Sequence, residues 1–319
     1  MPLEHTARNC WVFLVTAVAC CLLSGCGGTA VDPIMVDDSP AAQQGVDILV
    51  KELAGQGTSG GGTVAVLPDP EGFASLRGNF KITGAVNPLS PLATSGNDRA
   101  YCGPVPDDRI VVDAEKNLKN VLIFLSMKLP AAEEQRYGKW IHESYRETES
   151  AVLAGAAAFD QEKCRFKSRI FAMRATQTVK ILNSDTVGHN TNVKGPLGVA
   201  SINPTLPGGS DVDYTPGGAA KSPFAVSCSV HPWMSSWMIS LDHPYFAVTA
   251  ADGSFEIKDL PAGVELTFSL WHEKTQWLKN VDVVPADQIK TDKRGKFKMT
   301  LSAGQETEIA VELKSDLLY

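Results

Sequence analysis

Residues 228–234 read CSVHPWM and place a thiol, an imidazole and a thioether close together, at Cys228, His231 and Met234. Two soft sulfur ligands of different strength plus a nitrogen suit copper, whereas zinc prefers a tetrahedral set without a thioether. The run follows the apolar segment Phe224–Val226, so we expect it to be a loop at the end of a strand. These residues predict a copper site, and that site needs a second imidazole.

His189 is the expected second imidazole. It comes just after the strand-like segment Val179–Leu182, where a sandwich loop could meet residues 228–234. Each ligand has a simpler alternative. His189 could be a loop histidine bonded to the backbone, Met234 could be core packing, and Cys228 could be half of a disulfide.

These two motifs resemble the cupredoxin fold of the plastocyanin/amicyanin group over about residues 159–242, and the whole chain resembles methylamine-utilisation-protein-like bacterial lipoproteins. The resemblance implies one type 1 copper ion with His189 and His231 as nitrogen ligands, Cys228 as the short thiolate ligand and Met234 as the weak axial ligand. One position departs from related sequences, which often carry a histidine where this chain has Arg169.

A filled His2Cys set with a distant thioether favours outer-sphere electron transfer, because ligand movement is small and no position is left for a substrate. The resemblance also implies that the His231 edge emerges beside Pro232 and Trp233 and docks a redox partner such as a cytochrome or a dehydrogenase. The alternative is that Trp233 only caps the core. His243 and His272 lie outside the copper set, as packing or surface residues or as part of a second metal site.

Two other classes of function compete with the electron carrier. One is a binding or structural module of the cell envelope without functional copper, and the other is copper storage or delivery. An enzyme is not expected, since the HExxH and GxSxG motifs of zinc proteases and serine hydrolases are not found. Nucleic acid is not an expected partner either, because 29 Lys+Arg face 36 Asp+Glu, the net charge is −7 and there is no basic run.

The N-terminal residues predict export. A polar start ending at Arg8 precedes an apolar run over 11–23, which suits a signal peptide better than a membrane span. Residues 23–26 read LSGC and resemble a bacterial lipoprotein box, which implies cleavage after residue 25, acylation of Cys26 and an outer-membrane anchor facing the periplasm or the cell surface. An ordinary cleaved signal with Cys26 incidental is the alternative. Residues 26–75, rich in glycine and serine, read as a flexible tether.

Three cysteines remain in the mature chain once the signal and Cys26 are set aside: Cys102, Cys164 and Cys228. In an oxidising compartment an odd number needs an explanation. Pairing Cys102 with Cys164 would stabilise the fold by about 3 to 4 kcal/mol in the chain-entropy model and would leave Cys228 free for metal. A disulfide between Cys228 and either of the others would abolish the site.

Short strand-like segments recur from residue 76 onward and predict an all-β fold, a cupredoxin-like Greek-key sandwich combined with a small second sandwich. The expected strands are residues 78–86, 109–112, 120–126, 169–173, 178–182, 224–227, 236–241, 246–249, 254–257, 265–271 and 307–313. Only residues 131–150 look helical, with Trp140, Ile141 and Tyr145 as anchors to the core.

Residues 246–263 predict a hairpin with an Asp-Gly turn at Asp252-Gly253. The pattern of Thr249, Asp252-Gly253, Phe255, Ile257 and Leu260-Pro261-x-Gly263 resembles the carboxypeptidase regulatory-like, transthyretin-type sandwich. We therefore expect one such sandwich to be interrupted by an inserted domain. The expected organisation is a signal peptide (1–25), a tether (26–75), the first part of the regulatory-like sandwich (76–150), a copper domain (151–243) and the remainder of that sandwich (244–319).

Overall fold

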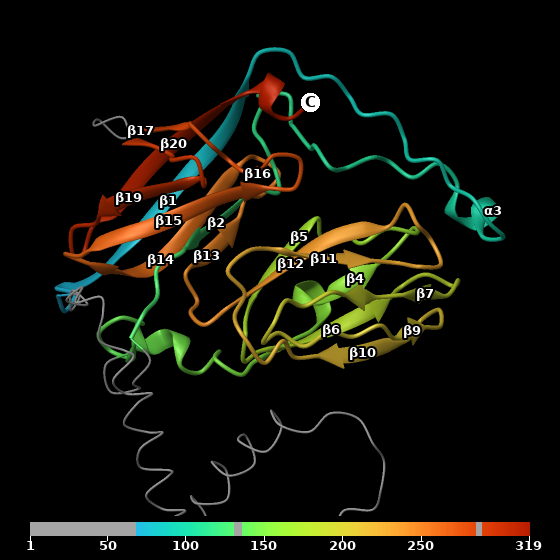
Figure 1. The fold of residues 1–319 in the computed structure, drawn as a ribbon, viewed down its shortest axis with the longest axis horizontal. Helices are drawn as coiled ribbons and strands as arrows, with labels where there is room; N and C mark the ends of the chain where they lie inside the picture. Colours follow the sequence, from blue (N-terminus) through green and yellow to red (C-terminus); the bar gives the residue numbers. More distant parts are fainter. Residues whose placement is uncertain (1–67, 131–135, 285–288) are drawn as a thin grey trace, which may run out of the picture. The chain divides into compact units, whose positions relative to one another are not determined.

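The structure is a computed structural model of the 319-residue chain and describes residues 68–130, 136–284 and 289–319. The expected signal peptide, Cys26 and most of the tether lie outside the described residues. Where the chain is described it is almost entirely β, which confirms the all-β prediction (Figure 1). No helix within these ranges is long and apolar enough to cross a membrane.

One sandwich, here called the split sandwich, takes its strands from both ends of the described chain. Its first sheet has the order β14 (Ser254–Ala262), β1 (Gly72–Thr83), β20 (Glu306–Lys314), β17 (Asp282–Val284) and β18 (Ile289–Lys290). Its second sheet has the order β13 (Phe246–Val248), β2 (Leu122–Leu125), β15 (Glu265–His272) and β16 (Gln276–Trp277), with β19 (Lys296–Thr300) also paired to β15. Because β1 pairs with β20 in parallel, the ends of the described chain are neighbours in one sheet.

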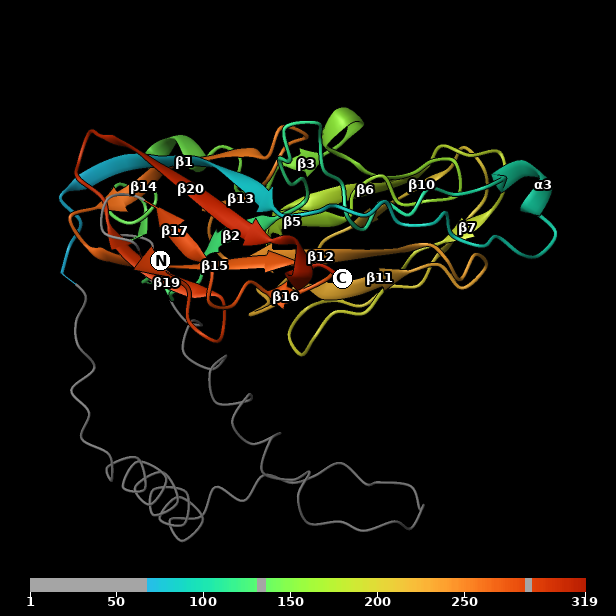
Figure 2. The same ribbon diagram turned by 90° about the horizontal axis from the view of Figure 1, so that it is seen from above.

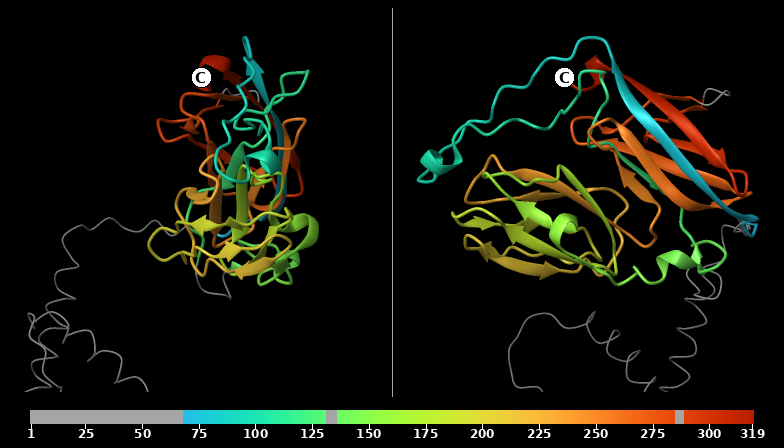
Figure 3. Two further views of the ribbon diagram at one scale, coloured as in Figure 1. Left: turned by 90° about the vertical axis from the view of Figure 1, so that its right-hand side faces the viewer. Right: turned by 180° about the vertical axis from the view of Figure 1, so that it is seen from behind.

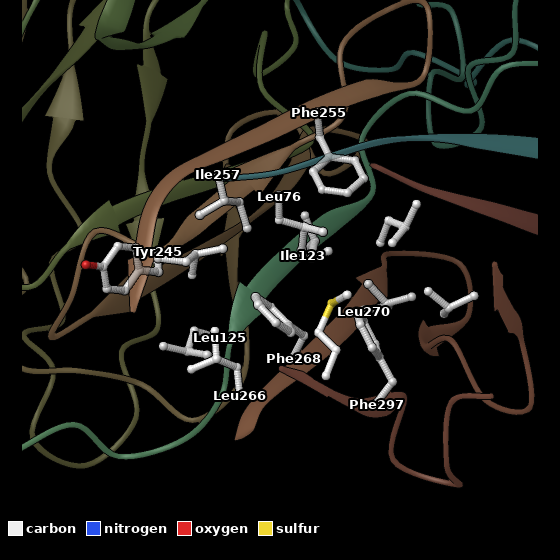
Figure 4. Close-up of a cluster of buried hydrophobic side chains, with 14 of the residues drawn as sticks. Leu76, Ile123, Leu125, Tyr245, Phe255, Ile257, Leu266, Phe268, Leu270 and Phe297 are labelled. Carbon is white, nitrogen blue, oxygen red and sulfur yellow. The ribbon is translucent and has the colours of Figure 1, made fainter. Parts of the chain in front are cut away.

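The core of the split sandwich is apolar, and both sheets contribute to it. Leu76 and Ile257 from the first sheet face Ile123, Leu125 and Phe268 from the second (Figure 4). Phe268 is fully buried, and its ring stacks on Phe297 with centroids 5.3 Å apart. Burying a side chain of this size contributes about 1.5 to 3 kcal/mol, so this cluster holds the two sheets together.

The second sandwich, here called the central sandwich, is formed by residues 152–241. One sheet contains β10 (Asp211–Tyr214), β6 (Thr178–Asn183), β3 (Val152–Leu153) and β4 (Phe159–Gln161), and the other has the order β5 (Ile170–Arg174), β12 (Ser235–Leu241), β11 (Phe224–Ser227) and β8 (Asn192–Val193). A short pair, β7 (His189–Asn190) and β9 (Thr205–Leu206), completes it. The antiparallel neighbours β6 and β10 lie next to each other in Figure 2.

Strand β2 is buried on both faces, as its unbroken apolar sequence LIFL requires. Ile123 and Leu125 belong to the core of the split sandwich, whereas Leu122 and Phe124 pack with the apolar cluster of the central sandwich. Trp271 of β15 joins that second cluster and meets Trp237 of β12 at 5.2 Å between ring centroids. Strand β2 therefore contributes side chains to both apolar clusters.

A long connection between β1 and β2 carries the short helix α3 (Arg99–Cys102), seen from behind in the right panel of Figure 3. Elsewhere in the described part of the chain, 3-10 turns occur at η2 (Glu143–Tyr145), η3 (Gly155–Ala157) and η4 (Ser315–Leu317).

Two local expectations were wrong. The described part of the expected helix, 136–150, contains turns and η2, although Trp140 and Ile141 are buried anchors as expected. Residues 109–112 form a single bridge, Val112 to Leu118, and no strand. In both segments hydrogen bonds between side chains and to local backbone replace the regular pattern, as where Arg109 binds Asp107.

Candidate metal centre

The CSVHPWM run is the loop of a hairpin between β11 and β12. The ladder runs from Phe224 opposite Met238 to Ser227 opposite Ser235. Within the loop the Cys228 N–H donates to the Met234 carbonyl at 3.2 Å, and the Met234 N–H donates to the His231 carbonyl at 2.9 Å. The hairpin thus fixes the spacing between Cys228 and His231.

His189 lies in β7, after a loop that Asn183 holds in shape. The Asn183 amide donates to the carbonyls of Val187 at 2.8 Å and Leu206 at 3.0 Å, and its oxygen accepts the Asp185 N–H at 3.1 Å. A Cβ on Gly208 would lie 2.7 Å from the Asp185 carbonyl oxygen, so only glycine allows this close approach. These contacts fix the loop between β6 and β7 and so set the position of His189 at the start of β7.

The two loops bring both imidazoles and the thiol together. Nδ1 of His189 lies 2.8 Å from Nδ1 of His231, and the ligand atoms of His189, Cys228 and His231 all lie within 4.8 Å of one another. The three side chains are buried, with exposed fractions of 0%, 3% and 1%. Of the four expected metal ligands, these three form a set that could hold a metal ion.

The outer nitrogen of each imidazole, Nε2, lies within hydrogen-bond distance of a carboxylate. Nε2 of His189 is 2.7 Å from Asp185, and Nε2 of His231 is 3.1 Å from Asp98. A carboxylate on one ring nitrogen fixes a neutral histidine as the tautomer whose other nitrogen is a free acceptor, and it raises the basicity of that acceptor. Both Nδ1 atoms are therefore oriented as ligands, which fits a metal bound between them and the sulfur.

The Cys228 sulfur accepts the backbone N–H groups of Asn190 and His231, each at 3.4 Å. Burial raises the pKa of this thiol, but the hydrogen bond from His189 and those from the backbone outweigh burial and hold the pKa below its ordinary value. The thiolate is the form that binds metals. These contacts therefore favour the thiolate form of Cys228.

The two imidazoles differ in their response to this environment. Burial lowers the pKa of His189, but its hydrogen bonds to Cys228 and Asp185 raise it more, so the net shift is upward. Burial lowers the pKa of His231, and the charge on a protonated His189 lowers it further, against the attraction of Asp98. His189 therefore binds a proton more readily than His231 does, and a metal cation would compete with that proton.

Asn190 fastens the two loops to each other. Its side-chain oxygen accepts the Ser229 N–H, and its amide donates to Asn203. The residue next to one histidine ligand thereby fixes the residue next to the cysteine. This arrangement limits relative movement of the candidate ligands.

Met234 is the fourth expected ligand. The structure buries it, with 2% of its surface exposed, in the same loop as Cys228 and His231. It also belongs to the apolar cluster of the central sandwich. Its packing is established, and its axial role stays a prediction.

Cys228, His189 and Asp185 also have the order of a nucleophile, a base and an orienting acid. Two features favour a metal over a nucleophile. The Cys228 thiol is buried, and a second imidazole, His231, lies within 4.8 Å of it in a set that could hold a metal ion.

The structure joins Cys102 to Cys164 by a disulfide and leaves Cys228 as a free cysteine. This is the pairing that keeps the candidate site intact. The Cys164 N–H donates to Asp185 at 2.8 Å, and the Cys164 carbonyl accepts Nε1–H of Trp233 at 3.0 Å. The disulfide therefore lies beside both loops.

The expected docking surface differs from what the structure shows. His231 is 1% exposed and its outer edge faces Asp98, so the expectation that this edge emerges at the surface was wrong. Pro232 is exposed, whereas Trp233 is partly buried and tilts against His231 with ring centroids 4.9 Å apart. A connection more than a hundred residues upstream covers the histidine.

His243 and His272 are packed inside the protein, away from this cluster. Nε2–H of His243 donates to the Leu125 carbonyl at 2.8 Å, and Nδ1 of His272 accepts the Lys274 N–H at 3.3 Å. Burial lowers the pKa of each to about 4. Both are neutral structural histidines.

Arg169, which stands where related sequences often carry a histidine, has a structural role. Its guanidinium binds Glu273 at 2.5 Å and the Ser235 carbonyl at 2.7 Å, with both charged side chains 5% exposed. It joins the start of β12 to the residue after β15. A buried charge of this kind is tolerated only with such partners.

Two residues of the site were not among those predicted from the sequence. Asp185 stands four residues before His189, a spacing that could have indicated a partner for the ring. Asp98 lies 133 residues before His231, and no local pattern links them.

Comparisons with known proteins give structural likeness only. No family model and no curated protein matches the chain. An oxidized amicyanin mutant aligns with 19% identity and a TM-score of 0.24, covering 28% of this chain and 85% of that one. A reduced amicyanin mutant aligns with 19% identity and a TM-score of 0.24, covering 38% of this chain and 98% of that one.

The copper-containing nitrite reductase of Thermus scotoductus SA-01 aligns with 17% identity and a TM-score of 0.24, covering 28% of this chain and 22% of that one. The assignment of the metal centre rests on its own geometry.

Proposed function

We propose that this chain is a type 1 copper protein that carries single electrons by outer-sphere transfer between redox partners of the cell envelope. The observation that supports it most is the convergence of two Nδ1 atoms and one thiol sulfur in a buried site, with both outer nitrogens on carboxylates. A thiolate with two imidazoles and a thioether nearby is a ligand set that favours copper.

Copper bound here would supply a one-electron couple. The protein supplies rigidity: Asn190 ties the loops together, the β11–β12 hairpin fixes Cys228 and His231, and Asp185 and Asp98 orient the rings. Ligands held in fixed positions give a geometry between those that Cu(I) and Cu(II) prefer. The ligands therefore move little when the copper ion gains an electron. Burial of the set keeps water and substrates away from the metal.

The proposal includes a membrane anchor. Acylation of Cys26 would hold the folded part at the outer membrane through the tether, where partners such as a cytochrome or a dehydrogenase exchange electrons with it. The mature N-terminal peptide should begin at Cys26 and carry acyl chains by mass spectrometry. A mature terminus at another residue would leave the copper site standing but remove the anchor.

The test of the metal site uses four buried histidines. Cu(II) is titrated into the full chain and into His189→Gln and His231→Gln, with His243→Gln and His272→Gln as matched controls. We expect one equivalent to give the intense absorption of a thiolate–Cu(II) bond in the wild type and in both controls, and no such band in the first two variants. Equal spectra in all five proteins would refute the site.

Copper storage or delivery is separated from electron transfer by kinetics. The same site would bind copper in each case, but a carrier exchanges electrons quickly between its oxidised and reduced forms, whereas a storage protein does so slowly. Electron self-exchange, measured by NMR line broadening in mixtures of the two forms, decides between them. Undetectable exchange would overturn the electron-carrier proposal while leaving copper binding intact.

A further inference from the structure

Residues 92–105, here called the strap, form a loop closed on itself beside the metal centre. The Leu92 N–H donates to the Val105 carbonyl at 2.8 Å, and the Thr94 hydroxyl donates to the Gly103 carbonyl at 3.0 Å. Cys102, at the end of α3, is bonded to Cys164 of the central sandwich. The strap is thus fixed both at its base and at its tip.

The strap reaches the outer side of both imidazoles. Asp98 lies 3.1 Å from Nε2 of His231. The Tyr101 hydroxyl donates to Asp185 at 3.1 Å, and the other oxygen of Asp185 is the one that meets His189. One short segment therefore contacts the environment of both nitrogen ligands.

The carboxylate of Asp98 is not used by its own helix. Aspartate at the N-cap of a helix usually accepts a backbone N–H of the first turn. Asp98 occupies the N-cap of α3, yet its side chain makes no capping hydrogen bond, and it extends to His231 instead. Local helix stability therefore does not explain the orientation of this carboxylate.

Resting on the function proposed above, we propose that Asp98 is a positioning residue of the metal centre, which holds the His231 ring through Nε2 and, with the rest of the strap, closes the ring edge to the outside. A carboxylate on Nε2 makes the imidazole a stronger donor to metal and favours the more highly charged ion. Loss of the Asp98 charge should therefore favour Cu(I) over Cu(II). Opening the strap should expose His231 and speed electron exchange.

The first experiment requires no copper. The full chain is treated with diethyl pyrocarbonate, which acylates accessible imidazoles, and peptides containing His231 are followed by mass spectrometry in the wild type, Asp98→Ala and Asp213→Asn. Asp213 is an exposed carboxylate of the same sandwich that pairs with Lys180 and not with a histidine. We expect Asp98→Ala to react about tenfold faster at His231, as losing one hydrogen bond to a charged group allows.

The second experiment measures the reduction potential of the copper-loaded chain. Asp98→Asn keeps the shape of the side chain and removes its charge, and Asp213→Asn removes the same charge elsewhere. We expect Asp98→Asn to weaken Cu(II) binding about tenfold more than Cu(I) binding. That ratio corresponds to a potential about 59 mV higher for a one-electron couple.

The two experiments separate the two proposals. A wild type without a thiolate–copper band would refute the proposed function, and the modification rates would still decide whether Asp98 shields His231. A blue wild type in which Asp98→Asn and Asp213→Asn have the same potential would overturn the positioning role alone. Equal modification of His231 in wild type and Asp98→Ala would overturn the shielding.

Discussion

The buried histidines of the described residues form two pairs that contrast sharply. His243 meets backbone groups through both ring nitrogens and His272 does so through Nδ1, and burial keeps the two rings neutral. His189 and His231 turn Nδ1 toward each other and toward a thiol, and their outer nitrogens meet carboxylates. The first pair belongs to the packing of the split sandwich. The second pair brings two Nδ1 atoms and a sulfur atom to within 4.8 Å of one another, a set that could hold a metal ion.

The two cores repeat this contrast. The split sandwich is held by aliphatic and aromatic side chains such as Phe268 and Ile123. The central sandwich buries Asp185, Asn183 and Gln161 beside its apolar cluster. Buried polar groups cost stability unless each has partners, and here the hydrogen bonds of Asn183 and Asp185 lead to the metal-binding loops. The polar groups that shape the candidate metal centre are thus buried in the central sandwich, whereas the core of the split sandwich is mainly apolar.

The largest expected effect is the loss of copper binding without loss of the fold when Cys228 is replaced. Cys228→Ala should abolish the thiolate–copper absorption completely, because no other free cysteine occurs among the described residues. The β11–β12 hairpin should remain, since backbone pairing holds it. Visible spectra and thermal unfolding of the metal-free variant measure both. Retained absorption would show that another residue supplies the sulfur.

A substitution in the core of the split sandwich should have the reverse effect, lowering stability while leaving copper binding unchanged. Phe268→Ala should lower the free energy of unfolding by about 3 to 5 kcal/mol, since a fully buried ring that stacks on Phe297 is replaced by a cavity. Copper spectra of the folded fraction should not change. Denaturant unfolding gives the stability. A loss of copper binding without loss of stability would contradict the division between the sandwiches.

Lowering the pH should destabilise the fold through the two structural histidines, His243 and His272. Their pKa is about 4 in the folded protein and near 6.5 when unfolded, so the unfolded state takes up protons first as pH falls. The free energy of unfolding should therefore be unaffected by these rings above pH 6.5 and should decrease as the pH falls toward 4, by about 3 kcal/mol for each histidine. Denaturant unfolding of the metal-free chain across this range measures the slope. In His272→Gln the contribution of that ring should vanish, and an unchanged slope would refute its assignment.

The fold was easier to predict from the sequence than the details of the site. Strand 224–227 was predicted with its observed ends, because Phe224 and Val226 alternate with less buried residues and turns lie on either side. The buried β2 was found from its unbroken apolar run. The segment 136–150 was predicted to be helical, but its described residues mainly form turns, a bridge between Tyr137 and Ile141, and η2.

The candidate ligands Cys228, His231 and Met234 could be picked out from the sequence because they share one short loop, and their binding of a metal stays a prediction. Asp98 could not be picked out, because its partner His231 is remote in sequence and only the folded strap brings them together. The same contact overturned the expectation of an open histidine edge. Local patterns reveal which residues can bind a metal, whereas tertiary structure decides what surrounds them.

The smallest effect is expected on the outside of the central sandwich. Lys180 pairs with Asp211 and Asp213 at about the usual ion-pair distance, but all three side chains are exposed to solvent. Pairs in water contribute little, because solvent screens them. Lys180→Ala should leave both the melting temperature and the copper spectrum unchanged. A marked change in either would mean that this surface supports the site.

The most direct test of the central claim is X-ray absorption spectroscopy at the copper edge of the metal-loaded full chain. Convergence of His189, His231 and Cys228 predicts two nitrogen neighbours and one short sulfur neighbour around a single copper ion. A copper ion surrounded only by nitrogen and oxygen, with no short sulfur distance, would contradict it.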